Sequence, residues 1–446
     1  MSIAFVHLSD IHFGQEKGGQ LIVNNDAKTQ LLADLPTVVS KLPSGRAAGL
    51  IVTGDIAYAG KAVEYRDAAD WLDDVSRAAG CEITDVQLVP GNHDIDHAEI
   101  TTVTEFMLGE IKTKGQEALD RFLADDDERA ILYRRFRHFM PFADGYRCPL
   151  NLQGGYAEER IVNLAPGRSI RFVRLNSALI CGKKDVEGSL LLGARQRIIN
   201  ARKGEELVVL SHHPLNWFQD GVDAGKFIRS RARVLITGHE HNPSVRPENV
   251  EPGCDILVLA AGATVPPHAD EVYTYNYNVI ELGWDEANDG LWVRIHPRTW
   301  NDDRKRFEAD TPRMGEPELY FSLACPHFRA AQRPGASELS TPEATPTTDQ
   351  AASVIILPLA EAAPEMDERM EPPDYSLLVL RFFRDITPQE RITLLVEYQA
   401  LPDGWTEVLS NAHERIALDA VVRNGRGNDL AARIDALLAD RKKGEG

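Results

Sequence analysis

At 446 residues the chain is too long for one ordinary hydrophobic core, so we expect two or three domains. Hydrophobic residues make up 43% and charged residues 26%, which is the balance of an ordinary globular protein. The net charge of −19 argues against a chain built chiefly to coat nucleic acid or an anionic membrane, although a locally basic groove stays compatible with it.

The cysteines and the first residues favour a cytoplasmic protein. Five scattered cysteines without C-x-x-C spacing are typical of reduced thiols rather than of a disulfide frame or zinc ribbon; they are Cys81, Cys148, Cys181, Cys254 and Cys325. Residues 1–7 have no basic region, apolar core or cleavage site, so we expect no signal peptide. No run of about 18 apolar residues is present to span a bilayer, so we expect no membrane association.

The first hundred residues alternate apolar runs with helical patterns. The expected strands cover 3–8, 50–53 and 86–89, and the expected helices cover 26–42, which Pro36 interrupts, and 62–79. A polar loop follows each strand. This rhythm predicts a layered α/β architecture with ligands gathered at the ends of the strands.

Residues 101–140 have a wholly helical pattern, and we interpret 101–145 as a helical insertion near the site, suited to substrate selection. Plain scaffold packing is the commoner role for any one residue of it. Its candidate buried residues are Phe106, Met107, Ile111, Leu119, Phe122, Leu123, Ile131, Leu132 and Phe136. Strands are expected again at 170–175, 207–210, 234–237 and 256–259, followed by a hairpin of 277–282 with 291–295.

The composition changes near residue 330. Residues 331–372 are rich in Pro, Ala, Ser, Thr and Glu, which predicts a linker, with an apolar island at 354–357 that could form a strand. Beyond it, a capping box at 387–390 and helices over 405–424 and 429–441 are expected. The predicted organisation is therefore a domain at 1–330, a linker at 331–372 and a small helical domain at 373–446.

Residues of the types that bind metal ions follow five of these strands. They are Asp10 and His12; Asp55; Asn92 and His93, followed by Asp94; His212 and His213; and His239 and His241. Asp10 and His12 stand two apart, so an extended backbone would point both side chains the same way. A lone buried His is more often a core residue, and an Asp after Gly more often marks a turn. Five such clusters at successive strand ends are not expected by chance, and together they predict a metal site.

The ligand types indicate which metals and which chemistry. A mixed oxygen and nitrogen set without thiolate suits Mn²⁺, Fe²⁺ or Zn²⁺ better than Ca²⁺ or a structural zinc. There are enough ligands for two ions, and a bridging carboxylate would hold them about 3.5–4 Å apart. Two such cations lower the pKa of a shared water to give hydroxide, and they offset the charge that develops on phosphoryl oxygens. The set therefore predicts hydrolysis of a phosphoester.

The motifs taken together resemble the series of the calcineurin-like metallophosphoesterases, over about residues 3–300. These motifs are Asp10-x-His12, Gly54-Asp55, Gly91-Asn92-His93-Asp94, His212-x-Pro214 and Gly238-His239-x-His241. The resemblance implies a four-layer α/β/β/α sandwich, which is two sheets flanked by helices. It implies one metal held by Asp10, His12 and His241, and a second held by Asn92, His212 and His239, with Asp55 bridging. It further implies that His93 is the general acid or orients the substrate and that Asp94 sets its tautomer, and it leaves His213 as a weaker candidate facing the substrate.

The substrate is less sharply indicated. Residues 53–60, Thr-Gly-Asp-Ile-Ala-Tyr-Ala-Gly, resemble the cyclic-nucleotide phosphodiesterase branch more than the DNA-repair nuclease branch. A phosphodiesterase acting on a cyclic nucleotide or related nucleotide is the leading hypothesis, although the helical segment departs from the compact enzymes of that branch. The basic run Arg134, Arg135 and Arg137 with Phe136 leaves a nuclease open, although such a run is usually a solvated face. A non-catalytic ligand-sensing or recruitment protein is the third hypothesis.

The last helices, within about 377–438, resemble the small adaptor domains of bacterial effector-recruitment systems. The resemblance implies a protein partner that binds through residues 373–446. The alternative is a helical appendage that only stabilises the chain.

Overall fold

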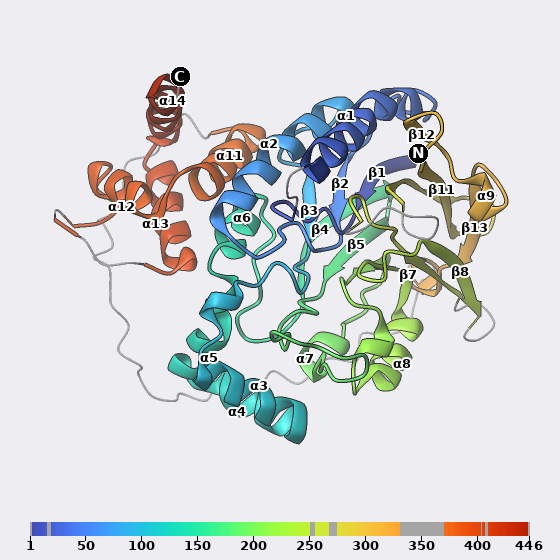
Figure 1. Cartoon of the computed structure of the whole chain (residues 1–446), viewed down its shortest axis with the longest axis horizontal. Helices are drawn as coiled ribbons and strands as arrows, with labels where there is room; N and C mark the ends of the chain where they lie inside the picture. The colour runs from blue at the N-terminus through green and yellow to red at the C-terminus, as the bar shows by residue number, and fades with distance from the viewer. Residues whose placement is uncertain are drawn as a thin grey trace. The chain divides into compact units, whose positions relative to one another are not determined.

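The computed structural model describes residues 2–15, 19–249, 255–266, 274–330, 370–402, 404–405 and 409–444. The chain divides into two compact units, residues 1–331 and 332–446, each of which is considered by itself (Figure 1). The linker expected at 331–372, with its strand at 354–357, lies almost wholly outside the described residues.

The first unit contains two sheets. One has the order β12-β11-β10-β1-β2-β3, with β13 also paired to β11, and the other has the order β4-β5-β6-β7-β9-β8. The strands of the first sheet are β1 (Ser2–Leu8), β2 (Gly49–Val52), β3 (Val86–Leu88), β10 (Asn276–Asp285), β11 (Gly290–Asn301), β12 (Arg306–Ala309) and β13 (Leu319–Ala324). Those of the second are β4 (Ala157–Ala165), β5 (Arg168–Arg174), β6 (Glu205–Leu210), β7 (Ala232–Thr237), β8 (Ser244–Asn249) and β9 (Asp255–Ala260).

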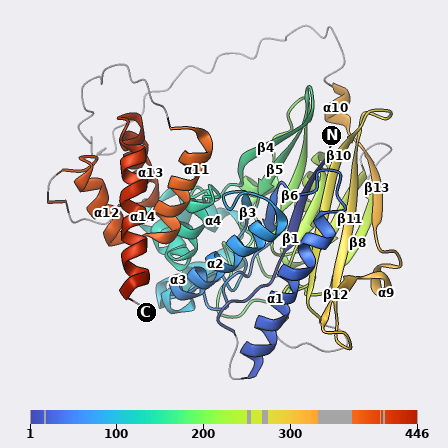
Figure 2. The same cartoon turned by 90° about the horizontal axis from the view of Figure 1, so that it is seen from above.

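The two sheets pack face to face around one hydrophobic core. Phe5 of β1 meets Phe172 of β5 edge-on, with ring centroids 5.2 Å apart, and apolar residues from both sheets surround this pair. Helices α1 (Gly19–Val39) and α2 (Ala62–Ala79) pack side by side on the first sheet, where α1 contacts β12 and α2 contacts β2 (Figure 2). Helix α8 (Gly221–Arg231) packs on β6 and β7 of the second sheet, and the short α7 (Ala194–Arg197) packs against α8. The four-layer α/β/β/α sandwich expected from the sequence is confirmed.

Residues 101–145, which were expected to be helical, form several short helices. They are α3 (Thr102–Lys114), α4 (Gln116–Ala124), α5 (Asp126–Tyr133) and α6 (Phe139–Gly145); the remaining short helices of this unit are α9 (Thr311–Met314) and α10 (Pro326–Ala330). Most of the expected core residues are buried, Ile131 is half-buried, and the prediction for Phe106 is wrong because its side chain is 64% exposed. Adjacent helical residues point about 100° apart, so burial of Met107 turns Phe106 outward.

Part of the basic run has a structural role. Arg135 is fully buried, and its guanidinium donates hydrogen bonds to the backbone carbonyls of Leu132, Leu179 and Cys181. Arg137 pairs with Glu99 at 2.5 Å. These arginines pin neighbouring loops together, so the run offers no argument for binding a nucleic-acid strand.

The second unit is a small helical domain. Its helices are α11 (Pro372–Leu380), continued by a π-helical turn over Arg381–Asp385, then α12 (Pro388–Glu397), α13 (Asn411–Arg423) and α14 (Gly427–Gly444). The capping box is confirmed, because Thr387 Oγ1 accepts from Glu390 N and Glu390 Oε2 accepts from Thr387 N at 2.9 Å. The helix expected from residue 405 begins only at Asn411, where Ser410 caps it by accepting from His413 N at 3.3 Å.

No helix in the described part of the chain combines the length and apolar composition needed to cross a bilayer. The four cysteines within the described ranges are free thiols, as expected; they are Cys81, Cys148, Cys181 and Cys325.

One buried ion pair ties the helical domain together. Arg391 Nε on α12 lies 2.6 Å from a carboxylate oxygen of Glu414 on α13, and the side chains are only 3% and 1% exposed. Arg391 also donates to the carbonyl of Ile386 at 3.2 Å. Removing one partner of such a pair leaves the other charge buried without compensation, which costs far more than the pair itself contributes.

Glu414→Ala is therefore expected to destabilise the helical domain by about 3–5 kcal/mol. Hydrogen exchange of α12 and α13 in the full chain measures this directly. Glu397→Ala is the matched control, because its pair with Arg433 on α14 is 44% exposed on both sides and should contribute less than about 1 kcal/mol. Equal loss of protection in the two variants would contradict the assignment.

Candidate metal centre

Strand ends from both sheets bring the predicted ligands together. In four overlapping groups, one ligand atom from each residue lies within 4.8 Å of the others. The groups are Asp10, His12 and His241; Asp10, Asp55 and His212; His12, Asp55 and His93; and His212, His213 and His239. Residues more than 200 positions apart in the sequence thus converge on one place, because parallel strands present their carboxyl ends at a common edge.

Asp55, which follows β2, occupies the middle of this cluster. Its Oδ2 lies 3.4 Å from His12 Nε2 and 3.3 Å from His212 Nε2. Its Oδ1 accepts a hydrogen bond from the backbone N–H of His93 at 2.8 Å. One oxygen is therefore fixed by the backbone, and the other faces two imidazole nitrogens.

The first side of the cluster is formed by Asp10, His12 and His241. Asp10 Oδ1 lies 3.1 Å from His241 Nε2. Asp10 Oδ2 accepts from Ser9 Oγ at 2.5 Å and from the backbone N–H of His239 at 3.1 Å. The carboxylate is held by one oxygen, so the other is presented to the cluster.

The second side is formed by Asn92, His212 and His239. His212 Nε2 lies 3.2 Å from Asn92 Oδ1 and 3.2 Å from His239 Nδ1. His212 Nδ1 is 2.7 Å from the carbonyl oxygen of Thr53. Because a carbonyl can only accept, Nδ1 carries a proton, and Nε2 is the nitrogen that faces the cluster and would be left to a bound metal ion.

The charges in the cluster are strongly coupled. Burial by itself would raise the pKa of Asp55, but the neighbouring His212 and His12 outweigh it and hold that pKa well below its usual range. Burial by itself would lower the pKa of His212, but the charge of Asp55 raises it to about 9. Burial and then the charge of His212 lower the pKa of His239 to about 4. Ionised carboxylates that draw protons onto buried imidazoles make a site where a bound cation would displace those protons.

Left-handed backbone recurs at these ligands. The φ angles are 53° at Asp10, 54° at His12, 52° at Asp55, 73° at His239 and 56° at His241. The extended backbone expected for Asp10 and His12 is therefore wrong, although both side chains still reach the cluster. Such conformations cost free energy for residues other than glycine, and they persist where the surroundings over-determine them, which is common at functional sites.

Two glycines leave room for the ligands. A Cβ on Gly91 would stand 2.1 Å from Asp55 Oδ1, and a Cβ on Gly54, where φ is +90°, would stand 2.6 Å from His212 Nδ1. The glycines of Gly54-Asp55 and Gly91-Asn92 are thus required by close approach, and at Gly54 by a positive φ as well.

His93 is held by a group that the sequence could not indicate. Its Nδ1 lies 2.8 Å from the carbonyl oxygen of Tyr58, so Nδ1 carries the proton and Nε2 is left to exchange one. The Tyr58 ring stacks on the imidazole, with centroids 5.2 Å apart and planes inclined by 19°. Every residue has a carbonyl, so no residue type signals this contact in advance.

Asp94 does not have the orienting role expected for it. Its carboxylate accepts from the backbone N–H groups of Ala57 at 3.0 Å and Gly91 at 2.9 Å, and from Tyr65 OH at 3.0 Å. Burial, and then the charge of Asp55, raises the pKa of Asp94 to about 6. Asp94 therefore ties together the loops that follow β2 and β3, while the Tyr58 carbonyl holds the ring of His93.

His213 is fully buried, so the expectation that it faces the substrate is wrong. Its Nδ1 lies 3.0 Å from Ser177 Oγ. Its ring packs against those of His212 and His239, with centroids 4.8 and 4.5 Å away. His213 supports the two neighbouring imidazoles from within the core.

Comparisons with known proteins agree with this arrangement. The family model for calcineurin-like phosphoesterases matches residues 3–243, and that for the GTPase-associated adaptor domain matches residues 374–436. The chain is 26% identical over 342 residues to an uncharacterized metallophosphoesterase-like protein, YydB, of Bacillus subtilis (strain 168), covering 72% of this chain and 65% of that protein.

Solved structures are more distant. Purple acid phosphatase PPD1 from yellow lupin has a TM-score of 0.40 and 11% identity, covering 78% of this chain and 57% of that one. The calcineurin-like phosphoesterase YfkN from Bacillus subtilis has a TM-score of 0.30 and 11% identity, covering 72% of this chain and 90% of that one.

A sandwich of two sheets with histidines and carboxylates at its strand ends defines a metal-binding phosphoesterase fold. The match to the family model over more than half of the sequence makes the assignment specific: the chain belongs to the calcineurin-like phosphoesterase family and carries a C-terminal GTPase-associated adaptor domain.

The position of Asp94 leads to a test of its role. Asp94→Asn would place an amide N–H₂ group against backbone N–H donors, so we expect both loops to shift and metal content to fall together with any activity. Metal analysis of the purified protein measures this. Asp74→Asn, at an exposed carboxylate on α2, is the matched control. Full metal content with only turnover lost would instead support the orienting role for Asp94.

Proposed function

We propose that the chain is a binuclear metal-dependent phosphoesterase whose substrate is a nucleotide-type phosphodiester. The observation that carries the proposal is the placement of Asp55 Oδ2, 3.4 Å from His12 Nε2 and 3.3 Å from His212 Nε2. A single carboxylate oxygen between two ligand sets is the arrangement that a pair of bridged cations requires.

The donors fit two divalent ions. One would be held by Asp10, His12 and His241 and the other by Asn92, His212 and His239, with Asp55 between them. Nitrogen and oxygen donors without thiolate suit Mn²⁺, Fe²⁺ or Zn²⁺. Two such ions, when bound, supply an acidified water and positive charge for the phosphoryl oxygens.

His93 supplies the proton chemistry in this proposal. Its Nδ1–H is fixed on the Tyr58 carbonyl, so Nε2 is the nitrogen that can donate a proton to a leaving oxygen. The ring stands edge-on to His12, with centroids 5.0 Å apart, which places it beside the first ligand set. A general acid in this position would protonate the leaving oxygen as its bond to phosphorus breaks, so that the group departs as an alcohol.

Variants at Asp55 and His93 separate metal binding from proton transfer. Asp55→Asn should lose bound metal and hydrolysis of bis(p-nitrophenyl) phosphate with Mn²⁺ present. His93→Gln should keep both metals while kcat for an alkyl phosphodiester falls by about 10²–10⁴. Metal analysis and steady-state kinetics measure the two effects.

A leaving-group comparison sharpens this experiment. p-Nitrophenolate needs little protonation, so His93→Gln should impair its release much less than that of an alkyl alcohol. Undiminished hydrolysis of both esters by Asp55→Asn and His93→Gln would contradict the proposed centre. A panel of cyclic nucleotides, linear dinucleotides and single-stranded DNA and RNA, assayed on the same preparations, tests the substrate class, and cleavage of the strands alone would favour a nuclease.

We also propose that the helical domain binds a protein partner. The proposal is supported by the match to the GTPase-associated adaptor domain, which makes a GTPase-linked protein the first partner to test. Ile416 on α13 is a large apolar side chain that is 54% exposed, which makes it a suitable position at which to test the proposal.

Ile416→Glu should weaken co-elution of the full chain with such a partner at least tenfold, while phosphodiester hydrolysis stays unchanged. Thr393→Glu on the exposed side of α12 is the control for added charge. Unchanged binding by the Ile416 variant would remove α13 from the interface.

A further inference from the structure

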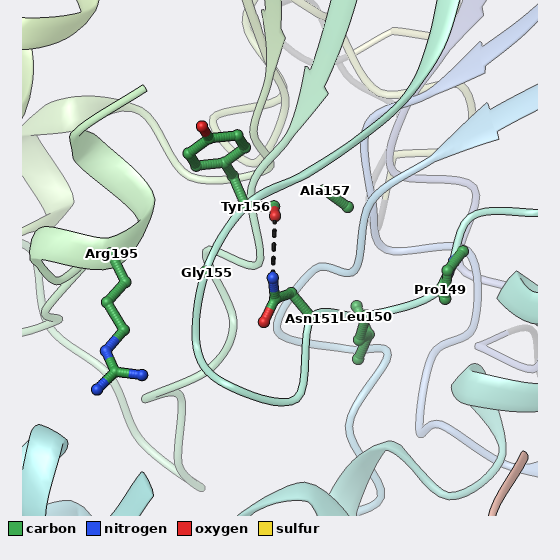
Figure 3. A pocket seen from close by; sticks show the side chains of 7 residues that line it. All are labelled: Pro149, Leu150, Asn151, Gly155, Tyr156, Ala157 and Arg195. Carbon is green, nitrogen blue, oxygen red and sulfur yellow. Dashed lines mark hydrogen bonds between the residues drawn. The ribbon is translucent and has the colours of Figure 1, made fainter. Parts of the chain in front are cut away.

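One hollow of the first unit stands apart from the metal centre. It is lined by residues 149–151, 155–157 and Arg195, and none of these belongs to a loop that carries a candidate metal ligand (Figure 3). Asn151 Nδ2 donates to the carbonyl of Tyr156 at 3.3 Å, the dashed line in Figure 3. Arg195 lies 3.4 Å from Asp120. Asn151 and Arg195 are thus engaged within the protein, and a second hollow has the closer relation to the metal centre.

The second hollow has a volume of about 370 Å³ and lies against two of the loops that carry histidines. Its lining includes residues 214–216, which begin two positions after His212, and Glu240, which stands between His239 and His241. Neighbouring Cα atoms are about 3.8 Å apart, so Glu240 brings the wall of the hollow within one residue of two candidate ligands. The hollow therefore adjoins the metal centre, and its volume is within the range of small-molecule sites.

The floor of this hollow is the outer face of the second sheet. Ile236 of β7 and Leu257 of β9 belong to the core between the sheets, so the alternate residues Leu235 and Val258 point to the opposite face. Helix α8 packs on β6 and β7, and its residue Arg229 forms one wall. Val258 is only half-buried, so apolar surface at the floor is open to a ligand.

Two arginines form a basic end of the hollow. Glu248 accepts from Arg229 Nε at 2.6 Å and lies 3.3 Å from Arg246 Nε. Within the described part of the chain, the Nη atoms of these two arginines donate no hydrogen bond. The side chains of Arg229 and Arg246 are 37% and 67% exposed, so both are accessible from solution. One carboxylate thus serves two guanidinium groups, which leaves a surplus of positive charge and free donors for an anion.

The strand register separates this basic end from the metal centre. Ser244 begins β8 near the edge of the sheet at which the histidines lie, and Arg246 pairs with Val258 two residues further along. At a rise of about 3.3 Å per residue, Arg246 lies roughly 7 Å further from that edge. Glu240 lies at the near end and accepts from Asn216 Nδ2 at 3.5 Å. An anionic group is therefore favoured at the far end of the hollow.

We propose that this hollow receives the part of the substrate that is joined to the scissile phosphate, and that this part is a nucleoside with a second phosphate. The inference rests on the proposed function, because it assigns the substrate of the same centre. The nucleoside lies on the apolar floor over Val258 and against Leu215, and the second phosphate accepts from the Nη groups of Arg229 and Arg246. A linear dinucleotide with a terminal phosphate is then preferred over a cyclic nucleotide.

Steady-state kinetics of the full chain with Mn²⁺ test the basic end. The substrates are thymidine dinucleotides with a 5′- or a 3′-terminal phosphate and the same dinucleotide without one. The parent should have a KM about tenfold lower for one of the phosphorylated forms, and Arg246→Met should abolish that preference through KM rather than kcat. Arg306→Met is the matched control, because Arg304 and Arg306 share Glu308 in the same way on the edge strand β12 of the other sheet.

A second variant tests the floor. Ser244 is exposed, so Ser244→Trp should fill the hollow without disturbing the core, and it should raise KM for all three dinucleotides while metal content stays that of the parent. Unchanged KM values in this variant would overturn the proposal. Equal KM values of the parent for all three dinucleotides would overturn it too, as would a parent-like preference in Arg246→Met or a lower KM for cyclic nucleotides. In each of these cases hydrolysis of bis(p-nitrophenyl) phosphate by the parent would remain, whereas its absence would overturn the proposed function and this inference together.

Discussion

The arrangement of the metal centre depends on the buried charge of Asp55 and on the two imidazoles, of His12 and His212, that lie next to it. Asp10, Asp55 and Asp94 are three almost fully buried carboxylates, and the charge of Asp55 acts on each of the other two. In a low dielectric, like charges so close repel strongly unless cations or ionised histidines stand between them. His12 and His212 take that place around Asp55, and two metal ions would do so more completely.

The backbone follows from the same constraint. Left-handed φ angles at Asp10, Asp55 and His239 bend the chain sharply at each strand end, so that side chains from separate strands point to one centre. Neighbouring side chains and backbone amides hold these bends. Ser9 and the N–H of His239 fix one oxygen of Asp10, and Asp94 collects N–H groups from the loops after β2 and β3. The strain is therefore offset by hydrogen bonds that also aim the ligands.

The sequence predicts the inner strands and the metal ligands because both can be recognised from the types of residue present. Buried parallel strands are apolar runs, and histidine pairs after them are rare. The strands it missed include the edge strands β4, β8 and β12, where polar residues, and Pro247 in β8, interrupt the pattern. Three other features depend on tertiary contacts, which residue spacing does not encode. They are the hydrogen bond between His93 and the Tyr58 carbonyl, the bonds by which Asp94 joins two loops, and the burial of Arg135.

The buried arginines of this protein show how its fold accommodates buried positive charge. Arg135 donates from Nε, Nη1 and Nη2 to three backbone carbonyls, and Arg391 faces Glu414 within the helical domain. Arg233 lies 3.3 Å from Glu206 and donates to the carbonyl of Asp255 at 2.7 Å. Each of these three charges is compensated by a fixed protein group. At these three arginines the fold itself supplies the acceptors or the carboxylate that offset the cost of burying a guanidinium.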